Sequence, residues 1–473
     1  MQRIAIVGSG IAGLSAARLL SRPTPGAPLG HAVTLFEAGS HFGGHAHTVD
    51  VTLNAVSHGV DTGFLVFNHR TYPGLTRLFD ELGVQTAPAE MSFSVQAREA
   101  AMSPALEWSG TDLNGVFAQR RNMLRPDFLR MLADILRFNR LTTALALAAD
   151  QGNETSAASG ASSASGASGA SGMALQQTVG EFLDQHRFSD VFRRWYLLPM
   201  IACIWSCPAR QMLAFPMLTL VRFCHNHGLL QVSNRPQWRT VRGGSRQYVR
   251  RIVQGLADAR LNTPVLAVHR DASGVRVNTA HGSEHFDELV LACHSDQALR
   301  LLGAGATADE RRVLGAIRYQ PNRAVLHTDT ALLPQQPRAW AAWNYETQAG
   351  VGAQSTAEAG GNVQTPARAG VCLHYLINRL QPLPWQQPVL VSLNPLRAPR
   401  VDQVIAEFSV DHPVFDQGAL AAQRELPGLQ GQHNTWFCGA WTGYGFHEDG
   451  LVSGQRVADA LLAAPPMLQA RVA

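Results

Sequence analysis

Residues 3–20 decide the fold, and they read RIAIVGSGIAGLSAARLL. The short apolar run at residues 4–7 predicts a buried parallel strand, because such strands are covered on both faces. Apolar residues recur at helical spacing from position 11 to position 20, which predicts a helix. Between strand and helix lies the pattern Gly-x-Gly-x-x-Gly, at residues 8–13. A strand, a glycine turn and a helix in this order predict the opening unit of an α/β sheet.

The glycines of this turn have separate predicted roles. Gly8 permits the tight turn, Gly10 lets the backbone approach a pyrophosphate, and Gly13 lets the helix pack closely on the strand. The N–H groups of Ile11 and Ala12 lie at the helix N-terminus, which favours phosphate. We therefore expect these five residues to bind the pyrophosphate of a dinucleotide.

An acidic residue follows where this motif requires one. Residues 33–36 predict the second strand, and Glu37 and Ala38 follow at its end. A carboxylate in this position can accept hydrogen bonds from both ribose hydroxyls. No arginine follows Glu37 closely, so a 2′-phosphate is not expected. The sequence thus predicts a site for the ADP part of a dinucleotide.

Two later segments resemble a known superfamily. Residues 40–48 (SHFGGHAHT) and 61–64 (DTGF) resemble the second glycine motif and following segment of the flavin-containing amine oxidases and phytoene desaturases. The resemblance implies FAD as the cofactor, in a Rossmann-like α/β domain of the glutathione reductase type, interleaved with an α+β substrate domain. It also implies cofactor contacts at Gly43, Gly44, His45, Asp61 and Gly63, with His45 standing where relatives carry an arginine that faces phosphate.

The C-terminal region agrees with this resemblance. Residues 436–440 (WFCGA) predict a strand that enters a glycine turn, and residues 450–462 predict a last helix. In the superfamily this strand and helix hold the ribityl chain and pyrophosphate of the flavin, which implies contacts at Gly439, Leu451 and Val452. A further contact, from backbone to adenine, is implied at Val265. Two glycine turns about four hundred residues apart favour FAD over a free nicotinamide nucleotide.

The resemblance also implies a division of the chain into domains. The FAD domain would combine residues 1–75, 238–300 and 430–473, and the substrate domain residues 76–237 and 301–429. Two segments, 152–172 and 347–370, are rich in small residues such as Gly and Ala and predict flexible inserts.

A narrower resemblance bears on the substrate. Residues 61–68 (DTGFLVFN), 238–245 (WRTVRGGS) and 443–450 (GYGFHEDG) resemble bacterial FAD oxidoreductases related to the N-terminal region of plant cyclopropane fatty acid synthases. This implies a hydrophobic substrate, fatty-acyl or lipid, and a lipid-modifying methyltransferase as a partner. Such a likeness is an analogy about the substrate and not evidence from a site.

Three residues are candidates for catalysis. His447, Glu448 and Asp449 precede the last helix, where a histidine and two carboxylates could shuttle a proton or set the charge of the flavin. The alternative interpretation is a cluster that caps a helix N-terminus, where the dipole favours acidic residues. The chain contains no lysine, so the lysine that many amine oxidases place near flavin N5 is absent.

Three functions therefore remain open. The first is an FAD-dependent oxidase or desaturase acting on a hydrophobic substrate. The second is a non-catalytic flavoprotein that serves a lipid-modifying enzyme. The third is a flavin amine oxidase, which the missing lysine disfavours.

Composition limits the cellular setting. A hydrophobic content of 46% and a net charge of +4 indicate a folded globular protein and give no sign of a nucleic-acid partner. The six cysteines are irregularly spaced. The histidine pairs His45/His47 and His225/His227 have no further ligands at suitable spacing, so no metal site is expected. Without a signal peptide or a spanning stretch, a cytoplasmic protein is expected. Five arginines in residues 121–140 raise the further expectation of peripheral contact with the inner membrane.

Overall fold

The computed structural model describes residues 2–23, 30–98, 105–158, 177–205, 212–229, 235–348 and 371–463. Most of the two predicted inserts, residues 159–172 and 349–370, lies outside these ranges. Residues 152–158, expected to be flexible, instead form the last turns of α4. None of the helices in the described ranges is long and apolar enough to cross a bilayer.

The predicted opening unit forms the centre of a five-stranded parallel sheet. Its strands, in spatial order, are β10 (Asp258–Arg260), β2 (Ala32–Phe36), β1 (Arg3–Val7), β14 (Glu288–Leu291) and β20 (Thr435–Phe437). Alternate residues of β1 enter two different apolar clusters. Ile4 and Ile6 pack toward α1 (Ile11–Leu20), whereas Ala5 packs toward the opposite face. Both faces are thus covered, as the apolar run predicted.

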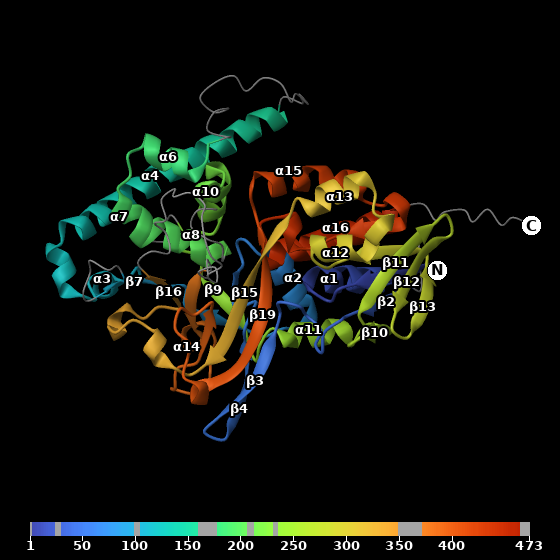
Figure 1. Cartoon of the computed structure of the whole chain (residues 1–473), viewed down its shortest axis with the longest axis horizontal. Helices are drawn as coiled ribbons and strands as arrows, with labels where there is room; N and C mark the ends of the chain where they lie inside the picture. Colours follow the sequence, from blue (N-terminus) through green and yellow to red (C-terminus); the bar gives the residue numbers. More distant parts are fainter. Residues whose placement is uncertain are drawn as a thin grey trace, which may run out of the picture.

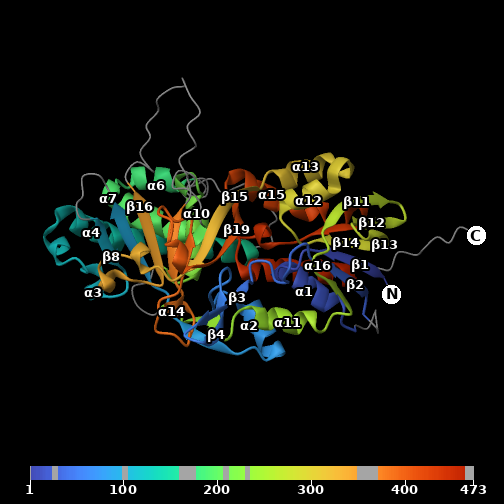
Figure 2. The same ribbon diagram turned by 60° about the horizontal axis from the view of Figure 1, so that its bottom comes forward.

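A three-stranded antiparallel sheet covers that opposite face, and Figures 1 and 2 show it at the N-terminal end of the molecule. It consists of β11 (Val265–Asp271), β12 (Gly274–Thr279) and β13 (Gly282–Phe286). The β-branched and apolar residues at 264–268 and 274–279 predict the first two strands, but the sequence does not predict β13. That strand reads GSEHF and has only Phe286 buried, so it carries little alternating apolar pattern.

The other large sheet is mixed and has seven strands. In spatial order these are β19 (Val404–Val414), β15 (Arg318–His327), β18 (Leu390–Leu393), β17 (Cys372–Leu376), β16 (Trp343–Gln348), β7 (Phe93–Arg98) and β8 (Leu106–Ser109). The pairing of β16 with β7 is parallel, and the other pairings are antiparallel. Helices gather on one side of this sheet in Figures 1 and 2. They include α4 (Pro126–Ala158), α6 (Val179–Gln185), α8 (Leu198–Trp205) and α10 (Met217–Asn226).

Two long predicted helices are interrupted. Apolar residues recur at helical spacing in residues 120–149 and predict one helix, but a 3-10 segment at Arg120–Leu124 ends before Pro126 starts α4. A residue that precedes proline avoids helical geometry, and Arg125 is extended. The apolar side chains of residues 179–207 likewise predict one continuous helix. Here α6 ends, Arg187 takes φ 51°, and α7 (Asp190–Phe192) follows with a π-helical turn before α8.

The remaining strands and α-helices lie outside these three sheets and the four helices just named. They are β3 (Thr48–Leu53), β4 (Val56–Asp61), β5 (Phe67–Asn68), α2 (Pro73–Leu82), β6 (Thr86–Ala89), α3 (Leu113–Val116), β9 (Trp238–Val241), α11 (Arg246–Val253), α12 (Ser295–Leu302), α13 (Ala308–Gly315), α14 (Ile377–Leu380), α15 (Gln417–Glu425) and α16 (His447–Ala463).

The domain division remains a proposal, and packing suggests one change to it. Residues 301–429 were assigned to the substrate domain as a block. However, Val313 of α13 and Ala422 of α15 pack in the same cluster as Ala5 of the parallel sheet. We therefore propose to place α13 and α15 with the FAD domain.

Candidate functional site

A cavity of about 1160 Å³ lies where the parallel and mixed sheets meet. Residues 7–12 and 36–38 line one end of it, and Trp343 and Tyr375 of the mixed sheet line another part. Sites for a single drug-sized ligand usually measure roughly 300–1,000 Å³. The cavity is therefore larger than a typical site for one drug-sized ligand.

The first glycine turn has the geometry of a phosphate cradle. Gly8 has φ 103°, which side chains other than hydrogen rarely allow, and a Cβ there would meet the carbonyl oxygen of Ala292 at 2.9 Å. A Cβ at Gly13 would overlap the carbonyl oxygen of Gly8, so Gly13 serves helix packing and does not line the cavity. A Cβ at Gly10 would meet no protein atom within 4 Å. Gly10 lines the cavity, so this space is open to a ligand.

Helix α1 presents unoccupied donors to the same space. Its N-cap is Gly10, which provides no side-chain hydrogen bond, and Ile11 and Ala12 line the cavity. The first N–H groups of a helix lack partners within the helix and carry its positive dipole end. These residues therefore fit the pyrophosphate that the sequence predicted.

Glu37 is held in place before any ligand binds. Its Oε2 accepts from the backbone N–H of Ser9 at 3.1 Å, and its Oε1 accepts from that of Gly39 at 2.8 Å. The Ser9 hydroxyl also donates to Oε2. A carboxylate has about four acceptor positions, so three protein donors leave room for one further hydroxyl. Both ribose hydroxyls could bind only if the Ser9 hydroxyl turned away.

Most of the other expected cofactor residues also reach this cavity. Gly44, with φ 56°, lies against the first turn, since its Cβ would stand 3.3 Å from the Cα of Gly10. The cavity lining also includes Ala38, Gly43, His45, Gly63, Val265 and Gly439. Their contact with the cofactor remains a prediction, which this geometry favours.

Asp61 occupies a different position from the one expected. It is buried away from the cavity lining, and its carboxylate accepts from Thr48 Oγ1, from the N–H and hydroxyl of Ser245, and from Gln381 Nε2. Burial raises its pKa to about 6. The structure thus gives Asp61 the role of joining β4 to the start of α11 and to Gln381, because protein donors already surround it.

The two residues predicted within the last helix are also not among those lining the cavity. Leu451 is buried against α2, where it would lie 2.9 Å from a Cβ at Gly74, and Val452 is half-buried. Further along α16, a Cβ at Gly454 would overlap the carbonyl oxygen of Ala12. The last helix therefore supports α1 from behind, while the turn at residues 439–441 reaches the cavity.

His447 is the one member of the predicted catalytic trio that lines the cavity. Its ring stacks on Phe64 with centroids 3.9 Å apart, and its Nε2 lies 2.6 Å from the Tyr248 hydroxyl. Burial lowers the pKa of His447 to about 3 and raises that of Tyr248. Both side chains are therefore uncharged at pH 7. His447 can accept a hydrogen bond at one ring nitrogen and donate one from the other, but it does not carry an extra proton.

The carboxylates of Glu448 and Asp449 instead accept hydrogen bonds from backbone N–H groups, as the alternative interpretation of a capping cluster predicted. Glu448 accepts from the N–H groups of Gly74 and Leu75, at the start of α2, at 2.6 and 2.9 Å. Asp449 accepts from the N–H groups of Tyr444 and Phe446 at 3.1 and 2.9 Å. Neither lines the cavity, because each carboxylate is turned toward backbone donors. The prediction of a catalytic role for these two residues is not supported.

Three histidines that the sequence did not select as catalytic meet at the cavity. The His45 ring lies 6.4 Å from that of His294 and 5.5 Å from that of His412. Burial lowers the pKa of His45 to about 4 and that of His412 to about 3, so both rings are neutral at pH 7. No local pattern marks His412, which lies in β19 far from the other two along the chain.

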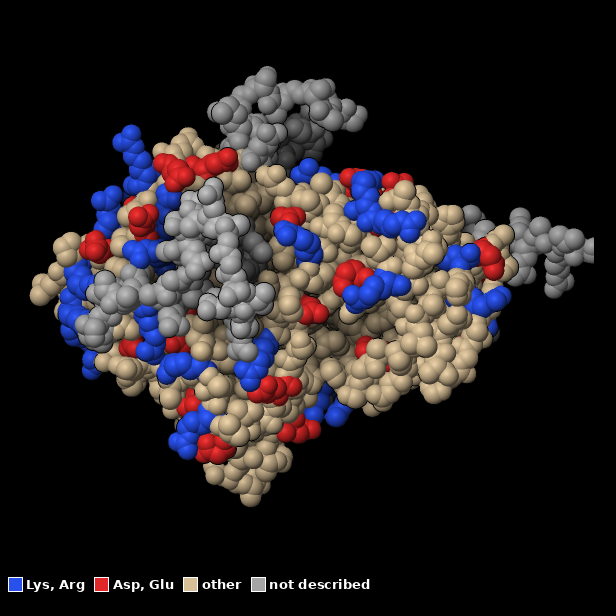
Figure 3. All heavy atoms as spheres, viewed as in Figure 1, with Lys and Arg blue, Asp and Glu red and all other residues tan. Residues whose placement is uncertain are grey.

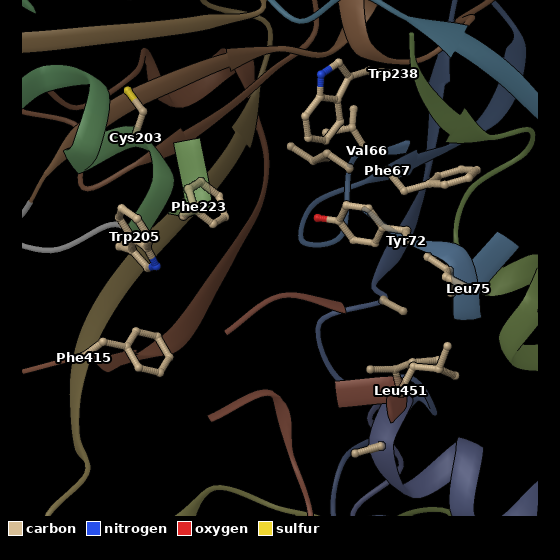
Figure 4. Packing of buried hydrophobic residues seen from close by; sticks show 14 of the residues in the cluster. Val66, Phe67, Tyr72, Leu75, Cys203, Trp205, Phe223, Trp238, Phe415 and Leu451 are labelled. Atoms are coloured by element: carbon tan, nitrogen blue, oxygen red, sulfur yellow. The ribbon is translucent and has the colours of Figure 1, made fainter. Parts of the chain in front are cut away.

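Most of the remaining cavity wall is apolar, although Asn139, His227, Arg235 and Gln237 also line it. Figure 4 shows Trp205 and Phe223 on one side and Tyr72 and Trp238 on the other. Other lining residues of this part are Met91, Phe93, Leu132, Ile135, Met200 and Phe446. Among the described lining residues, Glu37 is the sole carboxylate, and it lies at the glycine turn.

Comparisons with known proteins agree with this site. The model of the family described as flavin containing amine oxidoreductase matches residues 11–375. The sequence matches no curated protein. Three of the similar solved structures are a CLA-producing fatty acid isomerase from P. acnes, putrescine oxidase bound to putrescine, and cyclohexylamine oxidase from Brevibacterium oxydans.

These structures share the fold along nearly their whole length. The isomerase has a TM-score of 0.60 at 15% identity, with 98% of each chain covered. Putrescine oxidase has a TM-score of 0.64 at 16% identity, with 98% of this chain and 99% of that chain covered. For cyclohexylamine oxidase the values are 0.61, 16%, 97% and 98%. The chain belongs to the flavin-containing amine oxidoreductase family and is an FAD-dependent oxidoreductase.

Proposed function

We propose that this protein oxidises an apolar substrate of the fatty-acyl or lipid class. The observation that supports this is the wall of the cavity beyond the glycine turns, which is built mainly from aromatic and aliphatic side chains. Bound FAD supplies an acceptor for two electrons and a proton, and the protein supplies binding, orientation and exclusion of water. The apolar wall binds acyl chains through the area that it removes from water.

The neutral histidines suit such a reaction. His45, His412 and His447 each line the cavity and have a pKa lowered by burial to between about 3 and 4. They offer hydrogen-bonding nitrogens without adding positive charge. Because general-base catalysis favours a pKa near the working pH, imidazoles with pKa values this low would act as hydrogen-bond partners and not as bases.

An amine substrate fits the cavity less well. A protonated amine that leaves water needs an anionic partner or a strong acceptor. Glu37, the sole carboxylate of the described lining, lies at the glycine turn and already accepts from Ser9 and Gly39. The likeness to amine oxidases and to a fatty acid isomerase concerns the fold alone, so it does not choose between these substrates.

We also propose that the protein reaches its substrate at a membrane surface. Six of the eleven large apolar side chains exposed in the described residues lie between positions 113 and 147. Leu113 is 77% exposed, Leu124 86% and Leu136 59%. Figure 3 shows arginine side chains at the same end of the molecule. Arginines among exposed leucines favour an anionic lipid surface.

The stretch from which we expected peripheral membrane contact, residues 121–140, uses the main apolar face of its helix elsewhere. Phe128, Met131 and Phe138 of α4 are fully buried in the protein core. Leu132 and Ile135 of the same helix line the cavity. A membrane contact would therefore involve the opposite, leucine- and arginine-bearing face, with the cavity directly behind it.

Flavin reduction without oxygen tests the proposed substrate class. We expect unsaturated fatty acids or phospholipid vesicles to bleach the flavin absorbance, and putrescine and cyclohexylamine to leave it unchanged. Ile204→Asp adds a carboxylate to the apolar wall and should slow bleaching by lipid while FAD stays bound. The matched control is Val401→Asp, at a side chain that is 91% exposed.

The other outcomes separate the alternatives. Bleaching by amines alone would assign the protein as an amine oxidase and overturn the proposal. Bleaching by lipid only after addition of a lipid-modifying methyltransferase would assign it as the flavoprotein partner of that enzyme.

A further inference from the structure

Three ligand-type side chains meet on the mixed sheet, on the face away from the cavity. Trp343 of β16 and Tyr375 of β17 line the cavity. Glu346, Cys372 and His374 lie an odd number of positions from these residues along the same strands, so they point to the opposite face. All three are buried, with at most 2% of their surface exposed. The cluster is therefore separate from the flavin site.

The distances between the three donor atoms are close to those between atoms that bind one metal ion. Cys372 Sγ lies 3.5 Å from His374 Nε2, which lies 3.2 Å from Glu346 Oε2, and the sulfur lies 3.9 Å from that oxygen. In a tetrahedral zinc site with ordinary bond lengths, neighbouring donor atoms are about 3.3–3.6 Å apart. Small side-chain adjustments would bring all three atoms to bonding distance of one ion.

The backbone holds these side chains together. Glu346 pairs directly with Cys372 in the antiparallel ladder of β16 and β17, and Asn344 pairs with His374. Directly opposed residues of such a ladder have neighbouring Cβ atoms, and residues two apart lie on one face. The three ligands are thus fixed by sheet register and do not depend on a loop.

Outer hydrogen bonds orient two of the three ligands. His374 Nδ1 lies 2.7 Å from Ser392 Oγ, so donation from Nδ1 leaves the lone pair of Nε2 facing Cys372 and Glu346. Ser392 Oγ also lies 2.7 Å from His327 Nε2. Arg98 Nε donates to Glu346 Oε1 at 2.7 Å and leaves Oε2 on the side of the cluster. Ligating histidines and carboxylates commonly have such partners.

We propose that Glu346, Cys372 and His374 bind one divalent transition-metal ion, and that zinc suits this donor set best. A thiolate, an imidazole and a carboxylate are all zinc ligands. Binding would displace the thiol proton of Cys372 and any proton on His374 Nε2. The thiolate and the carboxylate then balance the two positive charges of the ion. The ion would join β16 to β17 and stabilise the mixed sheet behind the cavity.

Cobalt binding to the purified, FAD-loaded protein tests this proposal. After removal of metals with a chelator, we expect one Co²⁺ to bind per chain and to produce a sulfur-to-cobalt charge-transfer band. Added zinc should abolish the band and raise the thermal midpoint of unfolding, because an ion that binds the native state alone stabilises it. A wild-type protein without this band would overturn the proposal and would indicate a metal-free ion pair between His374 and Glu346.

Substitutions locate the ion. Cys372→Ser and His374→Gln should weaken cobalt binding by at least about tenfold, since the loss of an outer partner alone costs about 10–100-fold. The matched control is Cys224→Ser, at another buried cysteine, and it should retain the band. Flavin content shows whether each variant is folded. A folded Cys372→Ser variant that keeps the full band would contradict the assignment, as would loss of the band in Cys224→Ser.

Discussion

The two ends of the cavity are built in opposite ways. At one end, Gly8, Gly10 and Gly44 bring backbone toward the cofactor, and the residues concerned are close in sequence. At the other end, side chains such as Phe93, Trp205 and Trp343 come from separate strands and helices. In a backbone cradle a few glycines determine whether the cofactor fits, whereas in a side-chain wall many residues each contribute a small part of the binding energy. The comparison therefore predicts that substitutions in the cradle have large effects and that substitutions elsewhere have smaller, graded effects.

The largest effect is expected at Gly10. Gly10→Val places a side chain in the open space that faces the cavity, where a pyrophosphate would bind. Overpacking costs about 1–3 kcal/mol even in an adaptable core, which corresponds to about 5- to 150-fold, and a cradle of backbone adapts less, so we expect FAD binding to weaken by roughly 100-fold or more. Flavin absorbance of the purified protein measures this. Gly428→Val, at a glycine that also has no neighbour within 4 Å but lies off the cavity, should keep its flavin. Full occupancy in Gly10→Val would show that the cradle is misassigned.

A smaller effect is expected at Glu37. Glu37→Ala removes the acceptor for ribose and for the N–H groups of Ser9 and Gly39. A hydrogen bond to a charged group contributes about 1.5–3 kcal/mol, so FAD binding should weaken by roughly 10–100-fold. Titration of the protein without flavin measures the dissociation constant. Glu37→Gln retains one acceptor and should lie between Glu37→Ala and wild type. Equal affinity of all three proteins would exclude a ribose contact.

The third effect is the pH dependence of stability that His447 causes. Burial lowers the pKa of His447 from 6.5 to about 3. Between these values the unfolded chain holds a proton here that the native protein does not, so native stability falls as the pH falls below 6.5. Each such proton changes the free energy of unfolding by about 1.4 kcal/mol per pH unit.

His447→Gln keeps a polar partner for Tyr248 but removes this titration. Urea unfolding at pH 6.5 and pH 5 should therefore show a shallower loss of stability in His447→Gln than in wild type. His281→Gln, at an exposed histidine, should retain the slope of wild type. If His447→Gln also retains that slope, His447 is protonated in the native protein.

The smallest effect is expected on the outer face of α4. Arg140 is exposed beside Leu136, and a single arginine near an anionic bilayer contributes about 1 kcal/mol. Arg140→Gln should thus lower binding to anionic vesicles about fivefold at low salt. Co-sedimentation with vesicles measures this, and high salt should reduce the difference. Arg311→Gln on α13, at the other end of Figure 1, should bind like wild type. No binding of wild type at low salt would remove the membrane from the proposal.

The same contrast explains what could be predicted from the sequence. The turn at residues 8–13 and the acid at Glu37 obey local rules of backbone geometry, so their places in the cavity could be anticipated. The helix boundaries near Pro126 and Arg187 also depend on local backbone geometry, but apolar periodicity alone did not show them.

What could not be predicted depends on distant partners. His412 approaches His45 only because β19 and the first glycine turns meet in space. Glu448 looked catalytic beside the flavin motif, but the start of α2, remote in sequence, supplies the N–H groups that it accepts. The Glu346–His374 cluster requires the register of β16 and β17, which a single sequence does not reveal.

The order of strands in the parallel sheet has a consequence during synthesis. Strand β20 closes one edge of the sheet, and α16 packs on α1, yet both are made after almost all the rest of the chain. Until they leave the ribosome, β14 has an unpaired edge and the turn at Gly439 is missing from the cradle. An unpaired edge can recruit other chains. We therefore expect the flavin cradle to be complete only after residues 435–463 have been made.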